Sequence, residues 1–237
     1  MSGPLLSVRG LDAWYGRAQV LFDVSLEVGD GEVVALMGRN GAGKSTTMKS
    51  IMGLLGTRSG AIEFAGRRID RLEPFRISRA GIGYVPEDRR IFTDLTVLEN
   101  LAVGHRPPRA GAPAWSVERL FALFPNLAGM PQRPGGRMSG GEQQMLAVAR
   151  TLMGNPRLVL LDEPSEGVAP VIVEQMADMI VELKKHGLSV LLSEQNLAFA
   201  SAVGDRACVL EKGQVKFSGA MAALDADEAV RRQYLAV

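Results

Sequence analysis

The segment that most constrains the fold is a glycine-rich run, Gly38–Ser45, which reads Gly-Arg-Asn-Gly-Ala-Gly-Lys-Ser. It follows the apolar run Val33–Met37, which predicts a buried strand, and it precedes Ser45–Met52, which predicts a helix. The run matches G-x-x-x-x-G-K-[ST] in full, in the strand-to-helix context that supports this motif. We name it the phosphate loop, because the motif is typical of loops that hold a phosphate chain.

The residue types in the phosphate loop explain this chemistry. Its glycines let successive backbone N–H groups turn toward a chain of phosphates, and the following helix adds its partly positive end. We expect Lys44 to reach the β- and γ-phosphates and Ser45 to ligate Mg²⁺ through its hydroxyl. The nucleotide-binding residues predicted from this loop are Gly38, Asn40, Gly41, Ala42, Gly43, Lys44, Ser45 and Thr46.

Short apolar strands alternate with helices along most of the chain, which predicts an α/β fold whose parallel sheet is covered on both faces. Residues 88–150 are richer in helical patterns and are predicted to be an insertion into that sheet. A charged helix is predicted over Asp225–Arg232. Of 237 residues, 46% are hydrophobic and one is cysteine, so we expect one folded unit without disulfide bonds.

Two acidic residues follow the apolar strand predicted over Leu158–Leu161. The carboxyl end of a buried strand opens onto the crevice where ligands of α/β sheets bind. Asp162 there is expected to hold Mg²⁺, and Glu163 to orient and deprotonate an attacking water. Taken alone, two acids after a strand are also typical of a solvated loop; their pairing with the phosphate loop favours the catalytic interpretation.

A second candidate anion site is the segment Ser139–Gln143, which reads Ser-Gly-Gly-Glu-Gln before a helix predicted over Gln143–Met153. A serine and backbone N–H groups at a helix start can bind an anion, and they can equally be a simple helix cap. We name residues 139–143 the signature segment. The phosphate loop already accounts for one phosphate-binding site. A second anion site in the same chain therefore suggests contact with a phosphate held by another subunit.

Together these motifs resemble the nucleotide-binding subunits of ATP-binding cassette (ABC) transporters, over about residues 5–220. The resemblance implies a P-loop NTPase cassette with a mainly parallel sheet, an antiparallel β subdomain and a helical insertion. Residues 1–237 would form one such domain, with the ATPase core and β subdomain in 1–87 and 151–237 and a helical subdomain in about 88–150. Two subunits would pair head to tail, with each ATP between the phosphate loop of one and Ser139, Gly140, Gly141 and Glu142 of the other.

Other positions follow from the resemblance one at a time. Tyr15 lies where the family has an aromatic ring stacked on adenine, although a core aromatic at a strand edge is the alternative. Ser165-Glu166-Gly167 resembles the loop that touches the other subunit, but it departs from the common Ser-x-Leu-Asp form.

Two further positions depart from the common pattern. Glu87 replaces a glutamine that senses Mg²⁺ and water, and it can still bind the metal. Gln195 replaces a histidine that contacts the γ-phosphate, and an amide cannot shuttle a proton. Our hypothesis is that Glu163 is the base and that Gln195 only positions.

The segments 85–87, 139–146, 165–170 and 194–196 resemble the shorter ATPase of importers for branched-chain amino acids and their urea or amide relatives. That implies a second ABC ATPase, identical or more often different, two transmembrane permease subunits and an external solute-binding protein. A permease helix would dock beside Glu87 and residues 88–100, so the chain would lie at the cytoplasmic face of the inner or plasma membrane.

Two other functions stay open at this point, a soluble ABC-type ATPase in DNA repair or translation and a small-molecule kinase. A formal net charge of +1 gives no electrostatic reason for a nucleic-acid partner. A kinase would leave the signature segment unexplained. The longest apolar runs, of about five residues, fall well short of the roughly 20 that a spanning helix needs.

Overall fold

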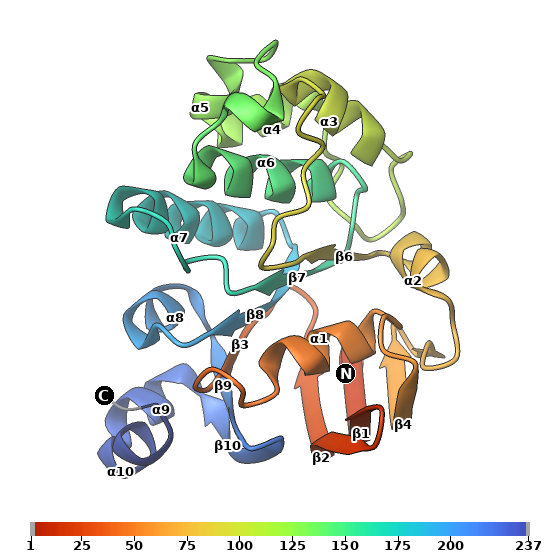
Figure 1. Ribbon diagram of the computed structural model, residues 1–237, viewed down its shortest axis with the longest axis vertical. Helices are drawn as coiled ribbons and strands as arrows, with labels where there is room; N and C mark the ends of the chain where they lie inside the picture. Colours follow the sequence, from red (N-terminus) through yellow and green to blue (C-terminus); the bar gives the residue numbers. More distant parts are fainter. Residues whose placement is uncertain (1–2, 236–237) are drawn as a thin grey trace.

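The computed structural model describes residues 3–235, and its strands form two sheets (Figure 1). One has the order β2-β1-β4-β5 and is antiparallel; its strands are β1 (Leu6–Tyr15), β2 (Ala18–Val28), β4 (Thr57–Phe64) and β5 (Arg67–Arg68). The other has the order β10-β9-β3-β8-β7-β6, with only the β9–β10 pair antiparallel. Its strands are β3 (Val33–Met37), β6 (Ile82–Val85), β7 (Leu158–Asp162), β8 (Ser189–Glu194), β9 (Arg206–Glu211) and β10 (Gln214–Ala220).

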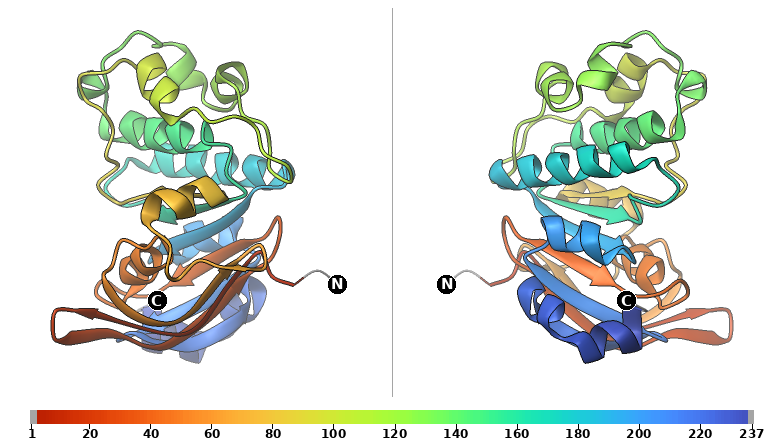
Figure 2. Two further views of the ribbon diagram at one scale, coloured as in Figure 1. Left: turned by 90° about the vertical axis from the view of Figure 1, so that its right-hand side faces the viewer. Right: turned by 90° about the vertical axis from the view of Figure 1, so that its left-hand side faces the viewer.

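Helices cover both faces of the six-stranded sheet. The helices of the described residues are α1 (Lys44–Ile51), α2 (Pro74–Ala80), α3 (Val97–Gly104), α4 (Val117–Leu123), α5 (Pro125–Ala128), α6 (Gly140–Leu152), α7 (Pro170–Lys185), α8 (Leu197–Val203), α9 (Met221–Ala226) and α10 (Glu228–Val230). A 3₁₀ turn, η1 (Gly135–Arg137), precedes α6, and a π-helical turn, η2 (Arg231–Leu235), follows α10. Helices α3 to α6 gather at one end of the molecule, and the β1–β2 hairpin projects at the other (Figure 2).

Side chains along the central strands point alternately to the two faces of the sheet, so the hydrophobic core is divided between these faces. Val159 and Leu161 of β7 join the cluster that includes buried residues of α6 and α7, whereas Leu158 and Leu160 join the cluster that includes α1 and the antiparallel sheet. Successive strand side chains point to opposite faces, so a strand with both faces covered must be apolar throughout. Helices α1 and α6 therefore lie on opposite faces of the six-stranded sheet.

The parallel strands bring distant parts of the sequence to one edge. The register pairs Met37 of β3 with Glu194 of β8, and Asp162 of β7 with Ser193 of β8. Because all three strands run the same way, the segments that follow them meet at their common carboxyl edge. The phosphate loop starts at this edge, directly after β3. Glu163 and Gln195 lie at the same edge, each one residue after the end of β7 or β8.

The predicted fold class is confirmed, and the differences are local. Helix α6 begins at Gly140 rather than Gln143, because Ser139 and Glu142 form a capping box that starts the helix despite two glycines. The short helices α2 and α5 were not predicted. The helix predicted over Asp225–Arg232 is interrupted: the chain leaves α9 at Asp227, whose carboxylate accepts the N–H of Val230 at 3.0 Å and starts α10.

Among the described residues, no helix has both the length and the apolar character needed to cross a bilayer. Cys208 is buried in β9, as a small apolar residue would be.

Candidate active site

Close backbone contacts fix the shape of the phosphate loop. A Cβ on Gly38 would lie 2.4 Å from the carbonyl oxygen of Leu210, and Gly38 also has a φ of 152°. Gly43, with a φ of 111°, lies against Leu21 of β2, where a Cβ would be 2.6 Å from Cδ2. Neither position admits a side chain without movement of its neighbours, so glycine at both is required for the turn from β3 into α1.

Lys44 begins α1, and its side chain is buried inside the loop. Its Nζ donates to the carbonyl oxygens of Gly38 at 2.7 Å and Arg39 at 3.2 Å, and it forms an ion pair with Oε1 of Glu163 at 3.0 Å. A buried ammonium needs such partners. Lysine is therefore held at the centre of the loop, next to the carboxylate that follows β7.

Asp162, at the end of β7, is 1% exposed, and both of its carboxylate oxygens accept hydrogen bonds. Its Oδ1 accepts from Ser45 Oγ at 3.0 Å and Ser193 Oγ at 2.6 Å, and its Oδ2 accepts from the hydroxyl of Tyr84 at 3.0 Å. Burial and the Asp162 carboxylate raise the pKa of Tyr84 far above its usual value, so the phenol remains a donor. Ser45 and Asp162, each predicted to ligate Mg²⁺, are thus in direct contact although 117 residues separate them in sequence.

The oxygen donors of Ser45 and Asp162 fit a magnesium ion, which is usually held by one or two protein oxygens together with phosphates and water. Glu87 is exposed and lines a cavity of about 470 Å³ together with Asp162 and Tyr84. Within residues 3–235 no three His, Cys, Asp or Glu side chains cluster as a metal cage. Any Mg²⁺ here would therefore depend on the nucleotide for much of its coordination.

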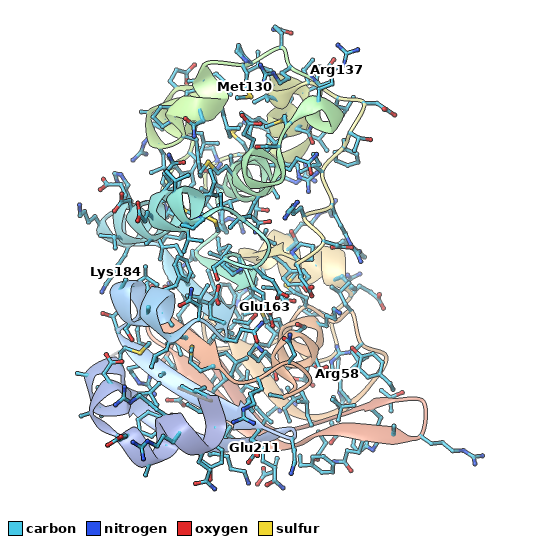
Figure 3. The ribbon with its side chains drawn as sticks, turned by 60° about the vertical axis from the view of Figure 1, so that its left-hand side comes forward. Arg58, Met130, Arg137, Glu163, Lys184 and Glu211 are labelled. Atoms are coloured by element: carbon cyan, nitrogen blue, oxygen red, sulfur yellow. The ribbon has the colours of Figure 1, made fainter. Side chains whose placement is uncertain are left out.

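Glu163 lies in the interior, between the helical part and the two sheets (Figure 3). Its φ is 47°, and its N–H donates to the carbonyl oxygen of Ser193 at 3.1 Å and to Ser193 Oγ at 3.0 Å. Burial opposes ionisation of its carboxyl, but hydrogen bonds from Glu166 and Lys44 outweigh burial and hold its pKa below the usual range. A left-handed backbone held by neighbours is typical of functional positions.

Gln195 contacts Glu163 directly. Its amide Nε2 donates to Oε2 of Glu163 at 3.2 Å and lies 3.5 Å from Oε2 of Glu166. The structure therefore brings together the base and the positioning amide that the sequence suggested. Glu166 is a third member of this group, and its hydrogen bond to Glu163, together with burial, raises its pKa to about 7.

Sequence reasoning missed Glu194, the last residue of β8. Its buried carboxylate accepts the backbone N–H groups of Ser165 at 3.0 Å, Gln195 at 3.2 Å and Asn196 at 3.2 Å. Burial raises its pKa in spite of these bonds. It joins the loop after β7 to the start of α8, and a charged residue within a buried strand was the only sequence signal for it.

The signature segment caps α6. Ser139 Oγ accepts the N–H of Glu142 at 3.3 Å, while Glu142 Oε2 accepts the N–H of Ser139 at 2.7 Å. Gly141 packs against Ile172 of α7, where a Cβ would come within 2.8 Å, and a Cβ on Gly140 would lie 2.9 Å from the guanidinium of Arg89. This segment belongs to a helix on the opposite face of the sheet from α1.

Tyr15 ends β1 opposite Ala18 in the projecting hairpin, and 48% of it is exposed. The alternative of a buried core aromatic is therefore wrong. An exposed ring at a hairpin tip remains available for stacking.

Comparison with known proteins supports this assembly of motifs. The ABC transporter family model matches residues 21–166. The high-affinity branched-chain amino acid transport ATP-binding protein BraG of Pseudomonas aeruginosa is 43% identical over 98% of this chain and 99% of its own length. The lipopolysaccharide export system ATP-binding protein LptB of Haemophilus influenzae is 35% identical over 98% of this chain and 97% of its own.

A solved structure agrees with the fold. The crystal structure of the ADP conformation of MJ1267, an ATP-binding cassette of an ABC transporter, superimposes with a TM-score of 0.81 and 28% identity, covering 96% of this chain and 97% of that one. The family model and the full-length relatives settle the family. This chain belongs to the ABC transporter family, as one of its ATP-binding, ATP-hydrolysing subunits.

Proposed function

We propose that this chain hydrolyses ATP at the cytoplasmic face of the membrane to drive import of branched-chain amino acids. The observation that supports the site is the meeting of Lys44, Glu163 and Gln195 at the carboxyl edge of the parallel strands. The support for the cargo is the 43% identity with the BraG subunit, against 35% with the lipopolysaccharide export subunit.

The phosphate loop binds the triphosphate of ATP. Its backbone N–H groups and the N-terminus of α1 face the phosphates, and Lys44 exchanges its contact with Glu163 for the β- and γ-phosphates. Tyr15 stacks on the adenine, and the loop residues from Gly38 to Thr46 surround the phosphate chain. Ser45 and Asp162, with Glu87 beside them, would hold Mg²⁺, which would supply positive charge to neutralise the phosphates.

Glu163 is the general base. Its carboxylate is buried, ionised and released from Lys44 once the phosphates take that contact, so it can orient a water and accept its proton. Gln195 donates an amide hydrogen to this carboxylate and keeps it in place. The base therefore acts from a position that neighbouring residues fix before ATP arrives.

Two subunits close over ATP. The signature segment of one, through Ser139, Gly140, Gly141 and Glu142, contacts the γ-phosphate held by the loop of the other. Loss of that phosphate removes these contacts, so ATP and ADP favour different states of the pair. The second subunit is a companion ABC ATPase or another copy of this chain.

The membrane subunits dock in a cavity of about 680 Å³ between α2, β6 and the α3–α6 end. Phe75, Arg79, Phe92, Arg106, Arg109 and Arg150 are among the side chains that line it. The ring of Phe92 is 47% exposed, with the guanidinium carbon of Arg150 at 5.1 Å from its centroid. Apolar rings among arginines suit an amphipathic helix with acidic side chains.

Reconstitution tests the function. The chain is assembled in proteoliposomes with its permease subunits, companion ATPase and external solute-binding protein, and leucine uptake and ATP hydrolysis are measured together. We expect ATP-dependent uptake that stops with Glu163→Gln. Hydrolysis that leucine and its binding protein never stimulate, or that nucleic acid stimulates instead, would refute the proposal.

A further inference from the structure

A buried hydroxyl interrupts an apolar strand at the centre of the parallel sheet. Ser193 follows Val190, Leu191 and Leu192 in β8, and all four side chains are fully buried. Strand β8 lies between β3 and β7, and its register places Ser193 opposite Asp162. Burial of a hydroxyl is costly unless its hydrogen bonds are made, so the partners of this one show what it does.

The two bonds of the Ser193 hydroxyl join two residues of the site. The hydroxyl donates to Oδ1 of Asp162 at 2.6 Å and accepts the N–H of Glu163 at 3.0 Å. The first partner is the carboxylate that would hold Mg²⁺, and the second is the proposed base. Neither bond involves the phosphate loop, so neither requires the ion pair of Lys44 with Glu163.

The pairing of the strands does not depend on this hydroxyl. The N–H of Glu163 already has an acceptor in the backbone carbonyl oxygen of Ser193 at 3.1 Å, and the backbones of β7 and β8 align Asp162 with Ser193. Glu163 has a φ of 47°, a conformation that persists only where its surroundings hold it. The hydroxyl is a second acceptor for the same N–H, so it restrains this turn.

Tyr84 offers an internal comparison. Its hydroxyl donates to Oδ2 of Asp162 at 3.0 Å from β6, on the other side of β7. Donors from both neighbouring strands therefore hold the Asp162 carboxylate, and such bonds orient carboxylates that ligate metals. Of these two donors, within residues 3–235, only Ser193 is also bonded to Glu163.

We infer that Ser193 is a positioning residue that aligns the Mg²⁺ ligand Asp162 with the general base Glu163. The bond that it donates fixes the orientation of the Asp162 carboxylate. The bond that it accepts fixes the turn from which the Glu163 carboxylate projects. Loss of the hydroxyl removes a restraint from both groups at once. The inference rests on the proposed function of these two carboxylates.

The first experiment measures binding of the β,γ-imido analogue of ATP to the full chain, with excess Mn²⁺ and with EDTA. Equilibrium dialysis gives two dissociation constants, and their ratio reports how well the protein holds the metal. The variants are Ser193→Ala, Ser193→Cys and Tyr84→Phe. The matched control is Ser189→Ala, because Ser189 is fully buried at the other end of β8 and accepts the N–H of Gly31 at 2.8 Å.

We expect Ser193→Ala to weaken binding of the Mn²⁺ complex about tenfold, the lower end of the loss when a group that supports a metal ligand is removed. Binding of the metal-free analogue should be unchanged, because the phosphate loop is intact. Tyr84→Phe should behave in the same way, and Ser189→Ala should match wild type in both constants. Ser193→Cys keeps a weaker donor of similar size, so it should fall between Ser193→Ala and wild type, and it decides the question if the alanine variant does not fold.

The second experiment measures ATP turnover by the assembled transporter as Mg²⁺ is raised to saturation. Ser193→Ala should keep a kcat about tenfold below wild type at saturating Mg²⁺, because the base has also lost a restraint; this is less than the 10²–10⁴-fold effect of a general base itself. Tyr84→Phe should lose activity at low Mg²⁺ and regain it at saturation, because its hydroxyl supports the metal ligand alone.

Three results would overturn the inference. They are wild-type binding of the Mn²⁺ complex by Ser193→Ala, an equal loss in Ser189→Ala, and a kcat of Ser193→Ala that saturating Mg²⁺ restores. The proposed function fails in a different way. Wild type that does not hydrolyse ATP would refute that function and the part of the inference that concerns Glu163, while the dissociation constants still decide the part that concerns Asp162.

Discussion

Removal of the Glu194 carboxylate tests how the site is held together. In Glu194→Ala the N–H groups of Ser165, Gln195 and Asn196 lose their acceptor inside the protein. These bonds are part-buried, and each contributes about 1 kcal/mol, so loss of three costs about 3 kcal/mol. For a chain of this length that loss lowers Tm by about 6–12 °C.

The assay is urea unfolding at pH 7 followed by circular dichroism, with Glu174→Ala on the exposed face of α7 as the control, expected within about 0.5 kcal/mol of wild type. Glu194→Gln should fall between the two, because its amide retains one acceptor oxygen but turns a donor toward the other N–H groups. A loss below about 1 kcal/mol in Glu194→Ala would refute this assignment of the three bonds.

Glu194 should also make the free energy of unfolding depend on pH. Burial raises the pKa of Glu194 in the folded protein above its ordinary value of 4.5. Folding therefore favours the protonated Glu194 carboxyl. Its contribution to the free energy of unfolding is complete below pH 4.5 and is lost as pH rises through the pKa of the folded protein. The difference in unfolding free energy between wild type and Glu194→Ala should thus widen as pH falls from 7 toward 4.5; a constant difference would contradict the shift.

Three further predictions concern function. Glu163→Gln should lower kcat by about 10²–10⁴-fold and Gln195→Ala by less, and the reverse ranking in steady-state ATPase assays would contradict our assignment of the base. Phe92→Ala should weaken assembly with the membrane subunits at least fivefold in a pull-down titration, while Val181→Ala on α7 should not; equal effects would count against the docking cavity. Tyr15→Ala should weaken ATP binding by about 1–3 kcal/mol in calorimetry, and unchanged affinity would exclude stacking.

The parts of the fold that the sequence predicted are those with a local signal. Val33–Met37 is a strand with the predicted bounds, and the strand predicted over Leu158–Leu161 is one residue longer, since short apolar runs have few other solutions. The start of α6 was placed three residues late, because two glycines oppose a helix and only the capping box reverses that. The break between α9 and α10 was not predicted, because Asp227 caps a new turn within a run of charged residues.

The site residues likewise divide into those that a local motif predicts and those that only the fold reveals. The phosphate loop and the pair of Asp162 and Glu163 each follow from a motif whose own residues lie within a few positions of one another. Glu166 and Glu194 do not, because Gln195, which lies beside Glu166, and Ser165, which donates to Glu194, come from separate loops that meet only in the folded chain. Strand register is a non-local property, and so is every contact that depends on it.

The central claim is that ATP, and not ADP, holds two half-sites together. Sedimentation of the Glu163→Gln protein with saturating Mg·ATP, alone and with its companion ATPase, tests it most directly. We predict a stable pair with Mg·ATP and separate subunits with Mg·ADP. Subunits that stay separate in both nucleotides, in either mixture, would contradict the account.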